Sequence, residues 1–242
     1  MDKTRVINSK ENIYKILCNG GIYLLVRGLK SIQIQIRERG LYISLIMNIK
    51  NIIAFSKSLV YKIIYPRNIN SNIFFMEQGS KFEIFNKKSK VYIGKCVFIR
   101  RNSRFRVDFD GRLEIGDYTF INDNCNINCV NFIFIGDNCK IASGVCINDH
   151  DHNYKKDEDD HLKRGSVSIG NNVWIGANTV ILRDSIIGDN AVIAAGSVVK
   201  GNIPPNTVYY LKREENFKTY VHNKSDIDSI ASLRRMNKEG EE

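Results

Sequence analysis

The chain has 242 residues, and its 36 Lys and Arg against 26 Asp and Glu give a formal charge of +10. Apolar residues make up 43% and charged residues 26% of the sequence, proportions that indicate neither a wholly disordered chain nor an integral membrane protein. This length can bury one sizeable core and carry a smaller appendage, but it does not indicate more than two domains.

The first segment, residues 1–68, holds most of the positive charge. It contains twelve Lys and Arg and only three acidic residues, a net charge of +9. No compact apolar stretch with a small-residue cleavage site follows Met1, so we expect no secretory signal and a cytoplasmic protein. The longest apolar stretch, 41–55, is interrupted by Ser44, Asn48, Lys50 and Asn51, which argues against a membrane span.

Apolar residues in this segment also recur at helical spacing. They form one stripe, which consists of Leu45, Ile49, Ile52, Ile53, Ser56, Leu59, Val60, Ile63 and Ile64. Two roles remain open for residues 1–68. A basic amphipathic helix can rest on an anionic membrane at its inner face, or a helical cap can pack its stripe onto the open end of a solenoid.

From Ile169 onward, a β-branched residue recurs at every sixth position. The series is Ile169, Ile175, Ile181, Ile187, Ile193 and Val199, and the same phase appears upstream at Ile115, Ile121, Ile127 and Ile133. An antiparallel sandwich would instead alternate with period two. Period six predicts a triangular coil of three short strands, in which each strand points one aliphatic side chain inward and stacked coils pair in parallel.

This repeat sets the predicted domain organisation. We expect a parallel β-helix over 69–208, preceded by the helical segment 1–68 and followed by a charged, short helical tail at 209–242. Pro204 and Pro205 stop the repeat, because proline cannot donate to a β-ladder. One long excursion, residues 148–166, interrupts the coils and is the expected functional loop.

Two stretches within the repeat are distinctive: residues 168–177, SIGNNVWIGA, and residues 192–206, VIAAGSVVKGNIPPN. They resemble the hexapeptide-repeat acetyltransferases, close to the branch that acetylates maltose, galactosides and polysaccharides. The resemblance covers roughly 110–208. It implies a left-handed β-helix, acetyl-CoA as co-substrate, and homotrimers whose active sites lie between neighbouring subunits. It also implies a sugar hydroxyl as acceptor, and a capsular or other surface polysaccharide or its precursor fits best.

The resemblance further implies a catalytic histidine at the start of the excursion. Counted from the pair Gly144-Val145, His152 takes the family's position for the general base, and His150 is the near alternative. A sugar hydroxyl must lose its proton as it attacks a thioester, and imidazole can accept that proton and pass it to the leaving thiolate. Asp149 and Asp151 either orient the imidazole or are simply solvated.

Asn122, on an earlier coil, matches an asparagine that helps to place the acceptor in this family. The alternative is that it only turns a corner of the coil, because asparagine tolerates left-handed backbone angles.

Acetyl-CoA is implied to lie in the groove between subunits, with its pantetheine amides near Ala177 and Ala195 and with Trp174 as a wall of the site. Basic residues near the last coil are expected to meet the nucleotide phosphates, and the candidates are Lys200, Lys212 and Arg213. Residues 208–213 depart from the family's usual Gly-x-Pro-Ala-Arg-like turn.

Two other functions remain as alternatives. A β-helical zinc carbonic anhydrase needs three histidines on facing coils of adjacent subunits, whereas His150, His152 and His161 all belong to one loop, so no metal is expected. A non-enzymatic β-helical scaffold would bind no acetyl-CoA. Residues 1–68 contain neither an aromatic-basic RNA motif nor a recognition-helix pattern, so nucleic acid is not an expected partner.

Overall fold

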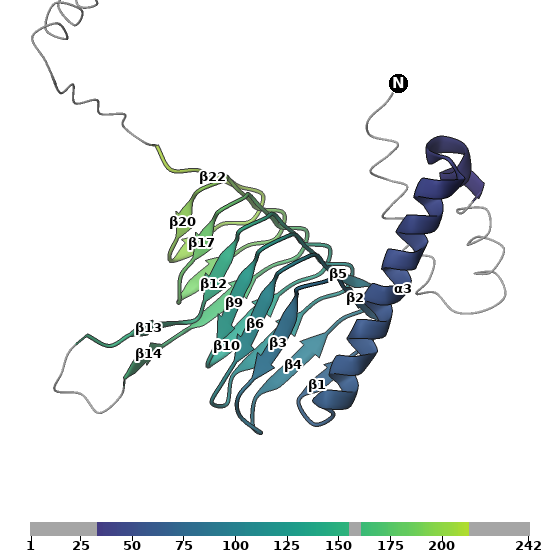
Figure 1. Ribbon diagram of the computed structural model, residues 1–242. Helices are drawn as coiled ribbons and strands as arrows, with labels where there is room; N and C mark the ends of the chain where they lie inside the picture. The colour runs from purple at the N-terminus through teal and green to yellow at the C-terminus, as the bar shows by residue number, and fades with distance from the viewer. Residues whose placement is uncertain (1–32, 155–160, 213–242) are drawn as a thin grey trace, which may run out of the picture. The chain divides into compact units, whose positions relative to one another are not determined.

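The structure is a computed structural model that describes residues 33–154 and 161–212 (Figure 1). Most of these residues wind into a parallel β-helix with three sheets. Sheet A runs in the spatial order β1 (Ile69–Ser71), β4 (Lys90–Ile93), β7 (Arg112–Ile115), β10 (Phe132–Ile135), β15 (Ser166–Ile169), β18 (Ser185–Ile187) and β21 (Asn202–Ile203). Sheet B runs β2 (Phe74–Met76), β5 (Val97–Ile99), β8 (Phe120–Ile121), β11 (Lys140–Ile141), β16 (Trp174–Ile175), β19 (Val192–Ile193) and β22 (Val208–Tyr209). Sheet C runs β20 (Val198–Val199), β17 (Val180–Ile181), β12 (Cys146–Asn148), β9 (Asn126–Cys129), β6 (Arg104–Val107) and β3 (Lys81–Ile84).

Successive strands visit the three sheets in turn, so one strand from each sheet makes one coil. The register stacks like upon like: Ile121 pairs with Ile141, Ile141 with Ile175, and Ile175 with Ile193. These side chains are fully buried, as are the repeat residues from Ile169 to Val199. The predicted parallel β-helix and its six-residue ladder are therefore confirmed.

The first coil lacks a visible six-residue period because aromatic residues fill it. Phe74, Phe82 and Phe105 are buried in the core, and the rings of Phe82 and Phe105 lie 4.8 Å apart. Phe74 and Phe82 belong to the first coil, which begins at β1, and Phe105 belongs to the second, whereas the six-residue series is traceable in the sequence only from about Ile93. Large aromatic rings fill the triangular core of the coil with fewer inward-pointing side chains.

Asparagine turns many corners of the coils. Asn124, Asn138, Asn172, Asn178 and Asn190 have φ between 55° and 60°, a left-handed conformation that asparagine tolerates better than most residues.

At the corner from sheet A to sheet B, a side chain of each coil accepts a hydrogen bond from a backbone N–H of the coil before it. The backbone N–H of Lys95 donates to Asp117 Oδ1 (2.6 Å), that of Asp117 to Asp137 (2.7 Å), that of Asp137 to Asn171 (2.8 Å) and that of Asn171 to Asp189 (2.6 Å). We call this series the aspartate ladder. In the last coil the equivalent position is Pro205, which has no N–H to cap.

Helix α3 (Leu41–Ile64) covers the N-terminal end of the β-helix beside β1 and β2 (Figure 1). Residues 33–39 are also helical, and Gly40, with φ of 81°, separates them from α3. Ala54 packs against Phe75 and Phe98 of the first two coils. Lys57 Nζ donates to the carbonyl oxygens of Glu77 (3.0 Å) and Ser80 (2.5 Å), so the helix is held by polar as well as apolar contacts.

The apolar stripe of α3 lies on the helix face that is turned away from the coils. All its aliphatic members are exposed, whereas the buried residues of α3 are Ser44, Ala54 and Ser58. The expectation that a cap packs its stripe onto the first coil is therefore wrong. Small side chains and lysine amines make the contact instead, because they fit a surface of aromatic rings and backbone carbonyls. By length and composition alone, α3 is also long and apolar enough to cross a membrane.

Candidate active site

The excursion leaves the solenoid after β12, at the corner from sheet C to sheet A. It begins and ends as a two-stranded antiparallel ribbon of β13 (His150–His152) and β14 (Leu162–Arg164), which projects from the coils (Figure 1). Residues 155–160 lie outside the described residues. Because side chains alternate along a strand, His150 and His152 share one face of the ribbon and Asp151 takes the other.

Asp149 anchors the start of the ribbon. Its side chain is 0% exposed, and its carboxylate accepts the N–H groups of Val130 (3.0 Å to each oxygen) and Asn131 (2.8 Å). The same carboxylate lies 2.9 Å from Nδ1 of His150. A buried carboxylate is stable only when donors surround it, so we expect Nδ1 of His150 to donate a proton to Asp149, the arrangement that leaves Nε2 of a neutral ring as the acceptor. Burial, followed by the nearby Asp149 carboxylate, raises the pKa of Cys129, so that thiol stays protonated.

The second histidine has a different environment. His152 is exposed, and no residue of the described part of the chain hydrogen-bonds its ring. Asp151 does not reach either imidazole. It accepts Arg183 Nε at 2.6 Å, while Arg183 Nη1 lies 2.6 Å from Asp184. The hydrogen bond with Asp151 is the main reason that the pKa of Arg183 is raised. Asp151 therefore ties the ribbon to a later coil and does not orient a base.

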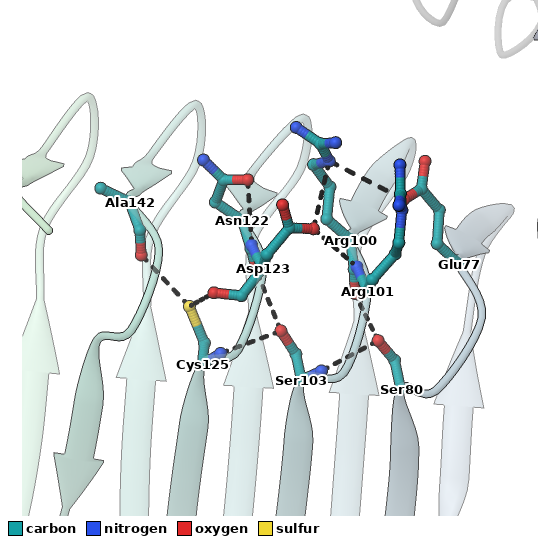
Figure 2. A network of polar contacts seen from close by, with 9 residues as sticks. All are labelled: Glu77, Ser80, Arg100, Arg101, Ser103, Asn122, Asp123, Cys125 and Ala142. Atoms are coloured by element: carbon teal, nitrogen blue, oxygen red, sulfur yellow. Dashed lines mark hydrogen bonds and ion pairs between the residues drawn. The ribbon is translucent and has the colours of Figure 1, made fainter. Parts of the chain in front are cut away.

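The corner from sheet B to sheet C, the B–C corner, stacks Asn122, Ala142, Gly176 and Ala194 in successive coils. Figure 2 shows its earlier coils, where Ser103 Oγ donates to the Asn122 carbonyl (2.8 Å) inside the corner. Outside the corner, the Arg100 guanidinium lies 3.4 Å from Asp123 and 3.7 Å from Glu77.

Asn122 Oδ1 accepts the N–H of Asp123 at 2.9 Å (Figure 2). Its oxygen is therefore engaged within the corner, and the amide nitrogen is the group that Asn122 can offer as a donor to an acceptor molecule.

In the later coils, the B–C corner exposes unused backbone donors. No described residue accepts a hydrogen bond from the N–H of Ser143, Ala177 or Ala195, whereas Asp123 Oδ1 accepts the equivalent N–H of Arg101 at 3.0 Å. The side chains are small here, and Gly176 must be glycine because a Cβ would lie 2.5 Å from Ala195 N. Successive N–H groups, about 4.8 Å apart, can bind the amide carbonyls of an extended ligand.

The predicted site residues thus fall at two corners of one chain. Asn122, Ala177 and Ala195 share the B–C corner, and Trp174 is exposed on sheet B beside it. The two histidines and the exposed Lys200 lie at the corner from sheet C to sheet A. One chain alone does not bring the predicted base to Asn122.

The remaining predicted phosphate-binding residues are Lys212 and Arg213. Lys212 is exposed, and Arg213 lies outside the described residues. Within residues 33–154 and 161–212, no three His, Cys, Asp or Glu side chains are arranged to hold a metal ion. No sequence spacing indicates the contact of Arg183 with Asp151 or the open N–H of Ser143.

Residues 166–201 match a family model described as bacterial transferase hexapeptide (six repeats). The galactoside O-acetyltransferase of Lactococcus lactis subsp. lactis is 34% identical over 159 residues, which cover 60% of this chain and 74% of that protein. The putative lipopolysaccharide biosynthesis O-acetyl transferase WbbJ of Escherichia coli is 35% identical over 130 residues, 48% of this chain and 66% of the relative. The galactoside O-acetyltransferase of Escherichia coli is 37% identical over 124 residues, 51% of each chain. The chain thus spans only about half to two thirds of the two Escherichia coli relatives.

Solved structures show the same fold. AntD, an N-acyltransferase from Bacillus cereus in complex with dTDP and 3-hydroxybutyryl-CoA, superposes with a TM-score of 0.51 at 18% identity. The match covers 73% of this chain and 96% of that one. The repeat, the coils and the L. lactis relative agree, and the chain belongs to the hexapeptide-repeat acetyltransferase family.

Proposed function

We propose that this chain is an acetyl-CoA-dependent O-acetyltransferase that acetylates a sugar hydroxyl. The observation that carries the proposal is a column of unused N–H donors at the B–C corner together with a histidine-bearing ribbon at the next corner. The first group suits a long amide-containing ligand, and the second supplies a base. The names of the relatives, a galactoside and a lipopolysaccharide O-acetyltransferase, support a sugar acceptor.

In the proposed reaction, the hydroxyl oxygen attacks the thioester carbonyl carbon while a histidine removes the hydroxyl proton. The carbon–sulfur bond breaks, and the same imidazolium returns the proton to the thiolate, so the products are an acetyl ester and a free thiol. His152 is the proposed base by its place after Gly144-Val145. His150 is the second candidate, because the buried Asp149 fixes its tautomer with Nε2 free.

The N–H groups of Ser143, Ala177 and Ala195 would bind the pantetheine amides, beside Trp174. Lys200, Lys212 and Arg213 are the proposed contacts of the nucleotide phosphates.

We also propose a homotrimer. A threefold arrangement would set the ribbon of one chain against the B–C corner of its neighbour, which joins the two halves of the site that one chain keeps apart. The acceptor would be a capsular or other surface polysaccharide or its precursor, and the enzyme would work in the cytoplasm.

The direct test is to incubate the purified chain with acetyl-CoA and a panel of free sugars, nucleotide sugars and capsule oligosaccharides, and to measure released thiol. Thiol release that depends on one acceptor class is expected. If no acceptor gives release and acetyl-CoA does not bind, the chain is a scaffold and the proposal fails.

The identity of the base is tested by a pair of variants. We expect His152→Ala to lower turnover at least about a hundredfold with the fold intact, and His150→Ala to lower it much less. The reverse order would assign the base to His150 and its Asp149 partner. Circular dichroism and sedimentation of both variants control for loss of fold or assembly.

A further inference from the structure

The two faces of α3 have different surroundings. One face is held by the coils through Ala54, Lys57 and Lys62, whose amine donates to the Ser71 carbonyl at 2.9 Å. The opposite face carries the apolar stripe. Its aliphatic members, Leu45, Ile49, Ile52, Ile53, Leu59, Val60, Ile63 and Ile64, are between 42% and 77% exposed. Capping the solenoid therefore does not explain why this face is apolar.

The charged residues of α3 all have one sign. Leu41–Ile64 contains no acidic residue, and the exposed Lys50 lies at the edge of the stripe. The exposed Arg67 follows just beyond the C-terminal end of the helix. An apolar surface bordered by cations complements the interface of a bilayer that contains acidic lipids.

We propose that the stripe docks this protein on the surface of an anionic lipid bilayer, with α3 lying in the plane of the interface. A spanning orientation does not fit, because Lys57 and Lys62 bind coil carbonyls and Ala54 is packed against Phe75. A second copy of the chain is a poorer occupant, because pairing two such faces would bring the like charges around them together. The proposal is independent of the catalytic assignment.

The apolar part is tested by sedimenting the full chain with vesicles of phosphatidylcholine alone or mixed with phosphatidylglycerol. We expect binding to the mixed vesicles at low salt. The double variant Ile52→Asp/Ile63→Asp should weaken that binding at least about tenfold. The matched control is Val208→Asp, because Val208 (62% exposed) is as exposed as Ile52 (63%) but lies in the last coil. This control should bind like the parent chain.

The charge part is tested by Lys50→Glu/Arg67→Glu. Each cation near an anionic surface contributes about 1 kcal/mol, which is about fivefold in binding, so the double reversal should lower binding more than about 25-fold. Binding to phosphatidylcholine alone should change little.

Three results would overturn the proposal. One is a full chain that ignores mixed vesicles at low salt. Another is an Ile52→Asp/Ile63→Asp variant that binds as tightly as the parent, which would assign binding to another part of the chain. The third is a stripe variant that changes the oligomeric state without lipid, which would assign the stripe to a contact between copies of the chain.

Discussion

The carboxylate of Asp149 holds the turn between β9 and β10 and the ring of His150 at the same time. One partner of Asp149 is His150, which follows it directly in the sequence. The other partners, Val130 and Asn131, belong to the preceding coil. The sequence therefore identifies a histidine-rich loop, and only the stacking of coils reveals which histidine is held and which is exposed. The contact of Arg183 with Asp151 is equally invisible in the sequence, because 32 residues separate the pair.

We expect Asp149→Asn to destabilise the fold by at least about 2 kcal/mol, because an amide NH₂ would face two backbone N–H donors in a buried site. Asp151→Asn is the matched control. Its side chain is 44% exposed and binds Arg183 at the surface, so its loss should cost under about 1 kcal/mol. Thermal unfolding of both variants checks this, and equal shifts would contradict the anchoring role of Asp149.

The coils and the cap were predictable to different degrees. The period of six is evident wherever one large apolar residue points inward per strand, and it is lost in the first coil, where Phe74 and Phe82 fill the core. Helical periodicity located the stripe of α3, but it could not tell which face meets the coils. The contact depends on small residues such as Ala54 and Ser58, which carry little hydrophobic signal.

Ala54 and Ile53 are neighbours in α3, but substitution by Asp should lower the stability of the fold much more at Ala54 than at Ile53. Ala54→Asp would bury a charge against Phe75 and Phe98 and should cost at least about 3 kcal/mol. Ile53→Asp lies on the exposed face and should change stability by less than about 0.5 kcal/mol. Urea unfolding measures both, and a tolerated Ala54→Asp would show that α3 does not stabilise the coil end.

At the scale of the whole molecule, the proposed homotrimer, with its site divided between chains, makes a prediction about mixtures. His152→Ala and Asn122→Ala trimers should each be nearly inactive. After dissociation and random reassembly, about a quarter of the interfaces would combine an intact histidine from one chain with an intact asparagine from another, so about a quarter of the activity should return. Each variant reassembled alone is the control. A mixture that stays inactive, or a monomer that transfers acetyl groups, would show that each chain holds a complete site.

The aspartate ladder has a direction. Each rung is provided by the coil that comes later in the chain, so a coil emerging from the ribosome has an unfilled backbone donor until the next coil has been synthesised. During translation, each coil should therefore complete its hydrogen bonds only after the next coil has been synthesised, so the solenoid should form from its N-terminal end towards its C-terminal end. Pro205 ends the series, because it has neither an N–H for a further rung nor a side-chain oxygen to cap the N–H of Asp189. A neighbouring chain that added a further coil at this corner would find no donor to cap in the last coil, which works against extension into a fibre.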